Sequence, residues 1–118
     1  MRIGLGSDEP TPLVEEIEAH LRSGGHQVTR YTANSPVPWP EVGHAVGQAV
    51  AKGDVDFGVV CCWTGTGVCM AASRVPGIRA ALCLDAVTAA GARRYNDANV
   101  LAVSLRSTSP AIAREILD

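Results

Sequence analysis

A thiol beside a glycine-rich loop is the feature of this sequence that most clearly suggests chemistry. Cys62 ends an apolar run that begins at Val55, and Thr64-Gly65-Thr66-Gly67 follows it closely. Glycines let the backbone of such a loop approach a ligand, and the N–H groups that open the next helix form a concave anion site. Helix-start N–H groups also favour the thiolate form of a nearby cysteine. We therefore interpret this segment as an active-site loop, with Cys62 as its candidate base.

The same loop offers hydrogen-bond donors to a substrate. The hydroxyls of Thr64 and Thr66, together with the amides of Gly65, Gly67 and Val68, could hold a developing oxyanion. The simpler alternative is that both threonines satisfy the backbone of their own turn, which is common in such loops.

Two adjacent acids follow the first apolar segment of the chain. The functional interpretation is that Asp8 binds a sugar hydroxyl and Glu9 performs acid–base work. The alternative, which applies to at least one of them, is a solvated loop charge or a helix cap.

The remaining cysteines are typical of small buried hydrophobic residues, namely Cys61, Cys69 and Cys83. Side chains alternate along a strand, so Cys61 and Cys62 face opposite sides and only one can face the loop. No paired C-x-x-C spacing is present, and none of the three histidines falls near the loop, so we predict neither a metal nor a cofactor. Redox sensing through Cys61, Cys62 and Cys69 is a weaker alternative.

These residues need a scaffold, and the hydrophobic pattern predicts strands that alternate with helices. The expected strands are residues 2–6, 26–31, 55–62, 79–84 and 100–105. Helices are expected at residues 13–21, at 41–51 after a proline-rich loop at 35–40, shortly after Gly67, from a cap at Asp85 to about Tyr95, and from Ser109-Pro110 onward.

Strict alternation predicts a single α/β domain over residues 1–118, a three-layer α/β/α sandwich around a doubly wound, five-stranded parallel sheet of Rossmann-like type. Ligands of such sheets bind outside the carboxyl ends of the strands, near the point where strand order reverses. Asp8, Trp39 and residues 62–68 are expected at that edge.

Composition narrows the classes of partner. The chain has 118 residues, a net charge of −2 and no basic run, which argues against nucleic-acid binding. No apolar run reaches membrane-spanning length and no targeting leader is visible, so we expect no membrane partner and a cytoplasmic location.

Three ordered blocks resemble the ribose-5-phosphate isomerase B and galactose-6-phosphate isomerase family over nearly the whole chain. The blocks, each with its family counterpart, are Cys62-Trp63-Thr64-Gly65-Thr66-Gly67 (C-G-T-G-x-G), residues 74–83 RVPGIRAALC (K-V-P-G-I-R-A-A-L-C) and residues 95–102 YNDANVLA (H-N-D-A-N-V-L-A). Their consistent separations make this much more specific than one glycine loop.

The resemblance implies a cofactor-independent enzyme that works as a homodimer or tetramer, with each site shared between subunits. Cys62 would move a proton between C1 and C2 of an open-chain aldose, and Thr64 with the loop amides would hold the enediolate. Asn96 would reach across from the partner subunit, and Arg106 would help to bind phosphate.

The chain departs from the family pattern around these positions. Glu9 stands where the family has a histidine, Tyr95 replaces the histidine that assists ring opening, Trp39 replaces a tyrosine, and Trp63 replaces a loop glycine. The sequence also stops at Asp118, before the arginines that grip phosphate in relatives. Glu9 could serve ring opening instead, and Trp39 or Trp63 could stack on the sugar face.

The preferred hypothesis is an aldose–ketose isomerase that acts on a small-molecule sugar or sugar phosphate, with a preference altered from ribose 5-phosphate. The alternative is a non-catalytic sugar- or metabolite-binding homologue, or the inactive subunit of a hetero-oligomer.

Overall fold

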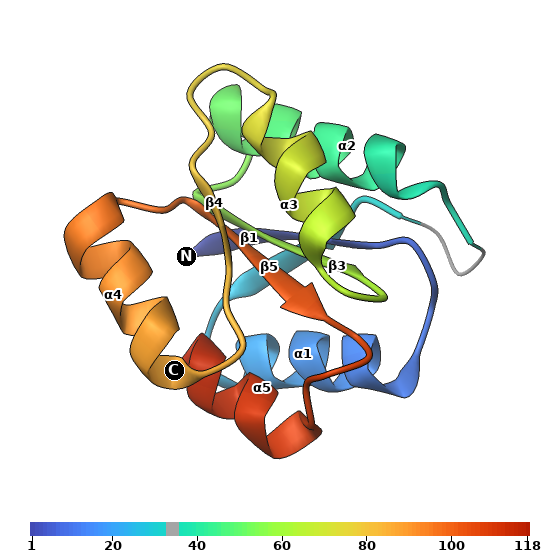
Figure 1. The fold of residues 1–118 in the computed structure, drawn as a ribbon, viewed down its shortest axis with the longest axis vertical. Helices are drawn as coiled ribbons and strands as arrows, with labels where there is room; N and C mark the ends of the chain where they lie inside the picture. Colours follow the sequence, from blue (N-terminus) through green and yellow to red (C-terminus); the bar gives the residue numbers. More distant parts are fainter. Residues whose placement is uncertain (33–35) are drawn as a thin grey trace.

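Strands and helices alternate from β1 to α5 in the computed structural model, which describes residues 1–32 and 36–118 (Figure 1). The strands are β1 (Arg2–Ser7), β2 (Gln27–Arg30), β3 (Phe57–Cys62), β4 (Ala80–Leu82) and β5 (Val100–Ser104). The helices are α1 (Pro12–Ser23), α2 (Trp39–Ala51), α3 (Thr66–Ser73), α4 (Ala86–Asn96) and α5 (Pro110–Leu117).

The five strands form one parallel sheet in the order β2-β1-β3-β5-β4. The chain therefore winds outward from β1 to β2 and then returns to build the other half from β3, which confirms the predicted doubly wound α/β class. The register pairs Ser7 with Cys61, and Cys62 with Ser104. Consequently the carboxyl ends of β1, β3 and β5 meet at one edge of the sheet.

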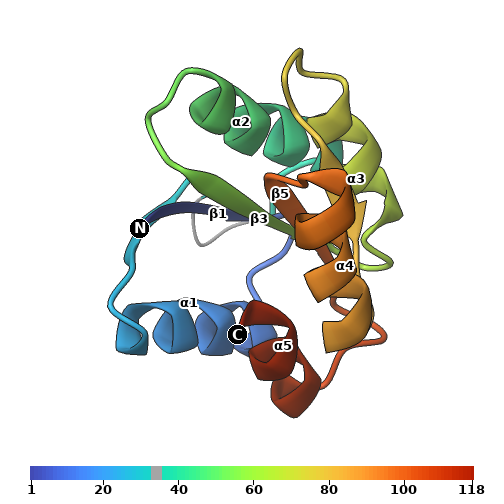
Figure 2. The ribbon, with the colours of Figure 1, turned by 90° about the vertical axis from the view of Figure 1, so that its left-hand side faces the viewer.

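Helices cover both faces of the sheet (Figure 2). One apolar core lies under α1 and α5 and contains Cys61, which is fully buried. A second core lies under α2 and α3 and contains Cys62. The two adjacent cysteines thus point to opposite faces, as strand alternation predicts.

The helix caps and boundaries show where local sequence signals suffice. Asp85 caps α4 as predicted, by accepting the Thr88 N–H at 2.7 Å. Helix α5 opens at Ser109-Pro110 as predicted, and Ser109 caps it by accepting the Ile112 N–H at 3.2 Å.

Other boundaries differ from the predictions. Helix α2 begins at Trp39, inside the predicted proline-rich loop, because Pro40 suits a first helical turn. Ser35 of that loop lies outside the described residues. Strand β4 is shorter than expected because it lies at the edge of the sheet, where only β5 pairs with it in the described chain. Helix α3 starts at Thr66, one residue before Gly67. Among the described residues, no helix combines the length and apolar character that crossing a membrane requires.

Candidate active site

Backbone hydrogen bonds hold the loops after β1, β3 and β5 together. The Asp8 N–H donates to the Cys61 carbonyl at 3.1 Å, and the Arg106 N–H donates to the Trp63 carbonyl at 2.9 Å. Because these bonds continue the ladder of the sheet, the loops inherit its rigidity. Asp8, Cys62 and Arg106 are thereby brought to one edge.

The Cys62 side chain faces the loop that follows it. Its sulfur accepts the Gly65 N–H at 3.2 Å, while only 5% of the residue is exposed. The sulfur therefore lies at the start of α3 and points toward the loop amides, within the core under α2 and α3 and away from the core under α1 and α5.

Gly65 is a position that only glycine suits. Its φ of +84° lies in the left-handed region, and a Cβ there would lie 2.5 Å from Leu82 Cδ1 and 3.2 Å from the Ser104 nitrogen. The sharp turn at this residue directs its own N–H back to Cys62.

The first turn of α3 can receive an anion. Gly65 is its N-cap and has no side chain that could cap the helix, so within the described residues the N–H groups of Thr66, Gly67 and Val68 are available to a ligand. The Thr64 and Thr66 hydroxyls lie 2.9 Å apart and bond to each other, and both residues are exposed. An incoming oxyanion can take over one of these hydroxyl donors as well as the amides.

Asp8 contributes an oxygen without a partner. Its Oδ1 is buried and makes no hydrogen bond within the described chain. Burial raises the pKa of the Asp8 carboxyl above its ordinary value, and the neighbouring Glu9 charge raises it further. An acceptor held in this way can receive a hydroxyl of a bound substrate. Glu9 itself is exposed, on a turn in which the Ser7 hydroxyl donates to the Glu9 carbonyl at 2.6 Å.

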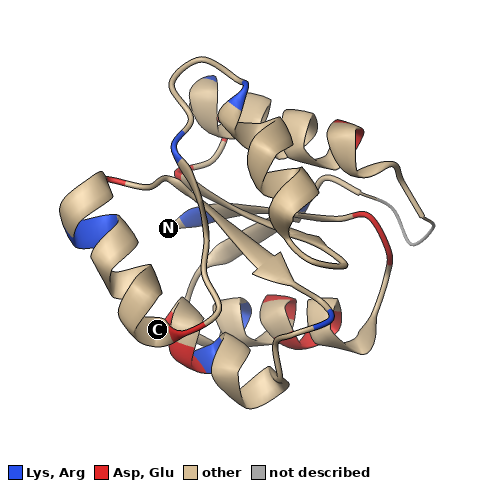
Figure 3. Cartoon of the chain, in the orientation of Figure 1, with Lys and Arg blue, Asp and Glu red and all other residues tan. Residues whose placement is uncertain are grey.

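Two indoles and one guanidinium complete this edge. Trp39, at the start of α2, lies against Gly67, whereas Trp63 is 61% exposed beside the loop. Arg106 is also exposed. The segment after β1 is acidic and the segment after β5 is basic, and both lie at the same end of the sheet (Figure 3). The edge therefore presents both signs of charge to a ligand.

Tyr95 and Asn96 do not join this group within one chain. They end α4, where the Asn96 carbonyl accepts the Nε–H of Arg79, a residue just before β4. The amino ends of β4 and β5 lie there, at the opposite edge of the sheet from Cys62. Tyr95 is 77% exposed.

Two supporting residues were not predicted. Ser104 is buried at the end of β5, and its hydroxyl donates to the Trp63 carbonyl and accepts the Ser107 N–H. Leu82 of β4 lies against Gly65 from behind. A serine that ends an apolar strand was a usable signal for Ser104, whereas the contact of Leu82 has no signature in the sequence.

The other thiols lack a comparable setting. Burial raises the pKa of Cys61 to about 12 and also raises the pKa values of Cys69 and Cys83. Thiols of this kind are poorly ionised and react slowly, which disfavours redox sensing through Cys61 and Cys69. In residues 1–32 and 36–118, no three histidine, cysteine or acidic side chains gather closely enough to hold a metal ion.

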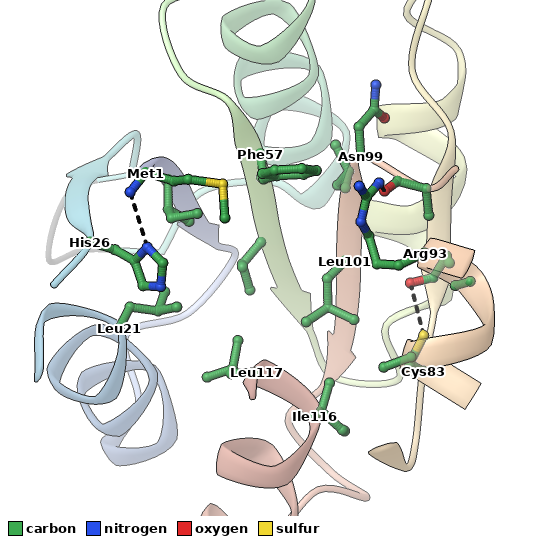
Figure 4. Close-up of a pocket in the computed structure, with 18 residues that line it drawn as sticks. Met1, Leu21, His26, Phe57, Cys83, Arg93, Asn99, Leu101, Ile116 and Leu117 are labelled. Atoms are coloured by element: carbon green, nitrogen blue, oxygen red, sulfur yellow. Dashed lines mark hydrogen bonds between the residues drawn. The ribbon is translucent and has the colours of Figure 1, made fainter. Parts of the chain in front are cut away.

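An apolar hollow of about 410 Å³ lies away from Cys62, on the sheet face that carries α1 and α5 (Figure 4). Its walls include Phe57, Leu101 and Ile116, with Arg93 stacked over the Phe57 ring at 4.6 Å. It contains Cys83 but none of the site residues predicted from the sequence. The candidate active site is therefore the open edge around Cys62 and not this hollow.

Fold and site together define a doubly wound α/β protein in which a thiol, an uncapped helix start and an unpaired carboxyl oxygen converge at the carboxyl edge of the sheet. Over residues 3–118, the chain matches the Ribose/Galactose Isomerase family. It is 35% identical over 122 residues to the D-erythrulose-4-phosphate isomerase of Pectobacterium atrosepticum, covering 99% of this chain and 80% of the relative. It is 39% identical over 121 residues to the galactose-6-phosphate isomerase subunit LacB of Clostridium acetobutylicum, covering 100% of this chain and 70% of the relative.

A solved structure agrees with these sequence matches. Ribose-5-phosphate isomerase B from Clostridium thermocellum superposes with a TM-score of 0.95 at 40% identity, covering 100% of this chain and 82% of the other. The chain belongs to the Ribose/Galactose Isomerase family, which places it among the aldose–ketose isomerases, the class predicted from the sequence.

Proposed function

We propose that this protein interconverts an aldose and a ketose, as a free sugar or a sugar phosphate, with Cys62 as the base. The observation that carries the proposal is the Cys62 sulfur, which accepts the Gly65 N–H at 3.2 Å beside an uncapped helix start. The three relatives named above act on different sugar phosphates according to their names, so the family allows variation in the sugar.

The reaction needs only proton transfers. The Cys62 thiolate removes the proton from C2 of the open-chain aldose and returns it to C1, while the C1 oxygen gains a proton and the C2 hydroxyl loses one. Charge develops on oxygen in the enediolate between these steps. The amides of the α3 first turn and the Thr64 hydroxyl are oriented to stabilise that charge.

Other residues at the edge would hold the sugar and set the preference. Asp8 Oδ1 would accept a substrate hydroxyl, and Trp39 or Trp63 would stack on the sugar face. Arg106 would bind a phosphate if one is present, but the exposed Glu9 carboxylate repels a dianion and is the candidate for ring opening. Because Arg106 attracts a phosphate while Glu9 repels it, we infer a substrate other than ribose 5-phosphate.

A complete site would need a second copy of the chain. Tyr95 and Asn96 lie at the other edge of the sheet, so only a partner subunit can bring them to Cys62. Exposed apolar side chains near the β3–α3 and β4–α4 connections suit such contact, namely Trp63, Met70, Leu84 and Val87. We infer a homodimer, or a tetramer built from it, with shared sites.

Incubating the protein with a panel of aldoses and aldose phosphates in deuterated water tests the proposal, because the reaction exchanges the C2 hydrogen. Uptake of deuterium is expected for at least one sugar, and Cys62→Ser should reduce it by a factor of about 100 or more. Cys83→Ala, a thiol of the other face, is the matched control and should retain activity. Absence of uptake, or full uptake by Cys62→Ser, would contradict the proposal.

A binding role is the second candidate, favoured by Glu9 and Tyr95 at positions where the family has histidines. In that case a sugar raises the melting temperature without turnover, or turnover appears only after a homologous subunit is added. A thermal-shift screen run on the same panel separates the two candidates.

A further inference from the structure

One face of α2 rests directly on α3. Trp39, Gly43 and Gly47 follow one another at intervals of four and share that face. A Cβ at Gly43 would lie 2.5 Å from Ala71 Cβ and 2.9 Å from the Val68 carbonyl oxygen. The two helices therefore touch through backbone, and the glycines leave no room for adjustment.

At the amino end of α2, Trp39 extends this contact to the loop at residues 64–67, which we call the reactive loop. A Cβ built on Gly67 would lie 2.8, 3.0 and 3.2 Å from three ring atoms of Trp39, so the indole covers the backbone of Gly67. The N-cap of α2 is Pro38, which makes no side-chain capping bond. The indole, although Trp39 is 45% exposed, thus adds a contact between the start of α2 and the first turn of α3 to the one that Gly43 makes with Val68.

The same first turn carries the donors of the candidate site. Gly67 lies two residues after Gly65, whose N–H bonds the Cys62 sulfur and whose carbonyl accepts the Cys69 N–H at 3.2 Å. Any movement of this turn changes the distance between the sulfur and its donor.

We propose that Trp39 is a positioning residue that clamps the first turn of α3 and so holds the backbone donors of the reactive loop against Cys62. It needs no contact with the reacting atoms to do so. This role goes beyond stacking on a sugar, because it operates in the unliganded protein.

Native-state hydrogen exchange, resolved by residue with NMR, tests the clamp. In Trp39→Ala the Gly65 and Cys69 amides should exchange about tenfold faster or more, while Val60 and Ala102 in the central strands change by less than about threefold. Trp39→Phe keeps a ring over Gly67 and should recover most of the protection. The matched control is Val50→Ala at the far end of α2, which packs on the same core. Val50→Ala should raise the exchange rates of the loop amides and of the strand amides by the same factor.

Equal acceleration of loop and strand amides in Trp39→Ala would show that the indole only contributes to general stability, and no acceleration would show that it clamps nothing. Either result overturns the proposal.

The consequence for turnover rests on the proposed isomerase function. With a sugar that the wild type isomerises, a clamp that leaves the sugar to Trp63 predicts that Trp39→Ala lowers kcat about tenfold with KM changed by less than about threefold, and that Trp39→Phe restores kcat. A higher KM with unchanged kcat would instead assign Trp39 to stacking on the sugar and contradict the clamp. If the wild type turns over no sugar, the isomerase proposal fails while the exchange experiment still decides the role of Trp39.

Discussion

Asp8 illustrates how a single residue of the site is held away from its most stable state. Its Oδ1 is buried without a hydrogen-bond donor, and burial followed by the Glu9 charge raises the pKa of its carboxyl. A carboxylate in this condition destabilises the folded chain, and that cost is tolerated where the oxygen has a ligand to receive.

Asp8→Asn should therefore stabilise the protein and reduce its activity. The pKa of the folded state is raised above the ordinary 3.8, so the folded state binds more protons than the unfolded chain and wild-type stability falls as pH rises through that window. We expect the variant to melt roughly 1–4 °C higher near neutral pH, allowing for the partial exposure of the group. The difference should shrink as pH falls toward 3.8. Thermal melts followed by circular dichroism over this range would measure it.

Asp85→Asn is the control with the opposite sign. The backbone N–H of Thr88 lowers the pKa of Asp85, so loss of that carboxylate should lower the melting temperature near neutral pH. A melting temperature of Asp8→Asn equal to or below that of the wild type would contradict the interpretation of Asp8.

At the scale of elements, two features define the β3–α3 connection, namely the left-handed conformation of Gly65 and the Leu82 side chain that packs against it. Gly65 has a φ of +84°, and a Cβ there would lie 2.5 Å from Leu82 Cδ1 of β4. Gly77 has a φ of +88°, but apart from its chain neighbours no atom of the described residues lies within 4 Å of its Cβ position. The two glycines share the same backbone requirement, but only Gly65 is also confined by packing.

This pair separates backbone strain from crowding. Gly77→Ala should destabilise the fold by about 1 kcal/mol through the left-handed conformation alone. Gly65→Ala should cost about 3 kcal/mol or more, because the new methyl group displaces Leu82 or the loop. It should also remove isomerase activity. Urea unfolding of both variants measures the difference, and equal costs would show that Leu82 does not confine the loop.

The sequence predicts most of the helices and strands, because the patterns that define them lie within each segment. Apolar runs located the strands, and Asp85 and Ser109 located the starts of α4 and α5. The seating of Trp39 on Gly67 and the lack of a partner for Asp8 Oδ1 were not predictable. Both depend on segments that are far apart in the sequence and meet only after the layers pack.

For the whole molecule, the arrangement divides the proposed site residues between two edges of one sheet. Cys62 lies at the carboxyl edge, and Asn96 lies at the end of α4 near the amino edge. In a two-fold dimer with shared sites, each site would combine Cys62 of one chain with Asn96 of the other.

Mixing two inactive variants tests this division. Cys62→Ser and Asn96→Ala chains, unfolded and refolded together in equal amounts, should recover about a quarter of wild-type activity, because half the dimers are hybrids and each hybrid has one intact site. Deuterium uptake measures the recovery. A mixture of Cys62→Ser with Cys62→Ala is the control and should stay inactive, and failure of the first mixture to exceed it would refute shared sites.

The two neighbouring sulfurs on β3 have a consequence for folding fidelity. In the observed register, Ser7 pairs with Cys61. Cys61 then faces α1 and α5, and Cys62, the next residue on the strand, faces α2 and α3. Sliding this strand by a single position would exchange the two sulfurs and bury Cys62, the proposed base, under α1 and α5. A molecule with this register error would bury nearly the same residues but would have no thiol at the proposed site. Isomerase activity would therefore detect such an error, whereas a measurement of the size of the folded chain would not.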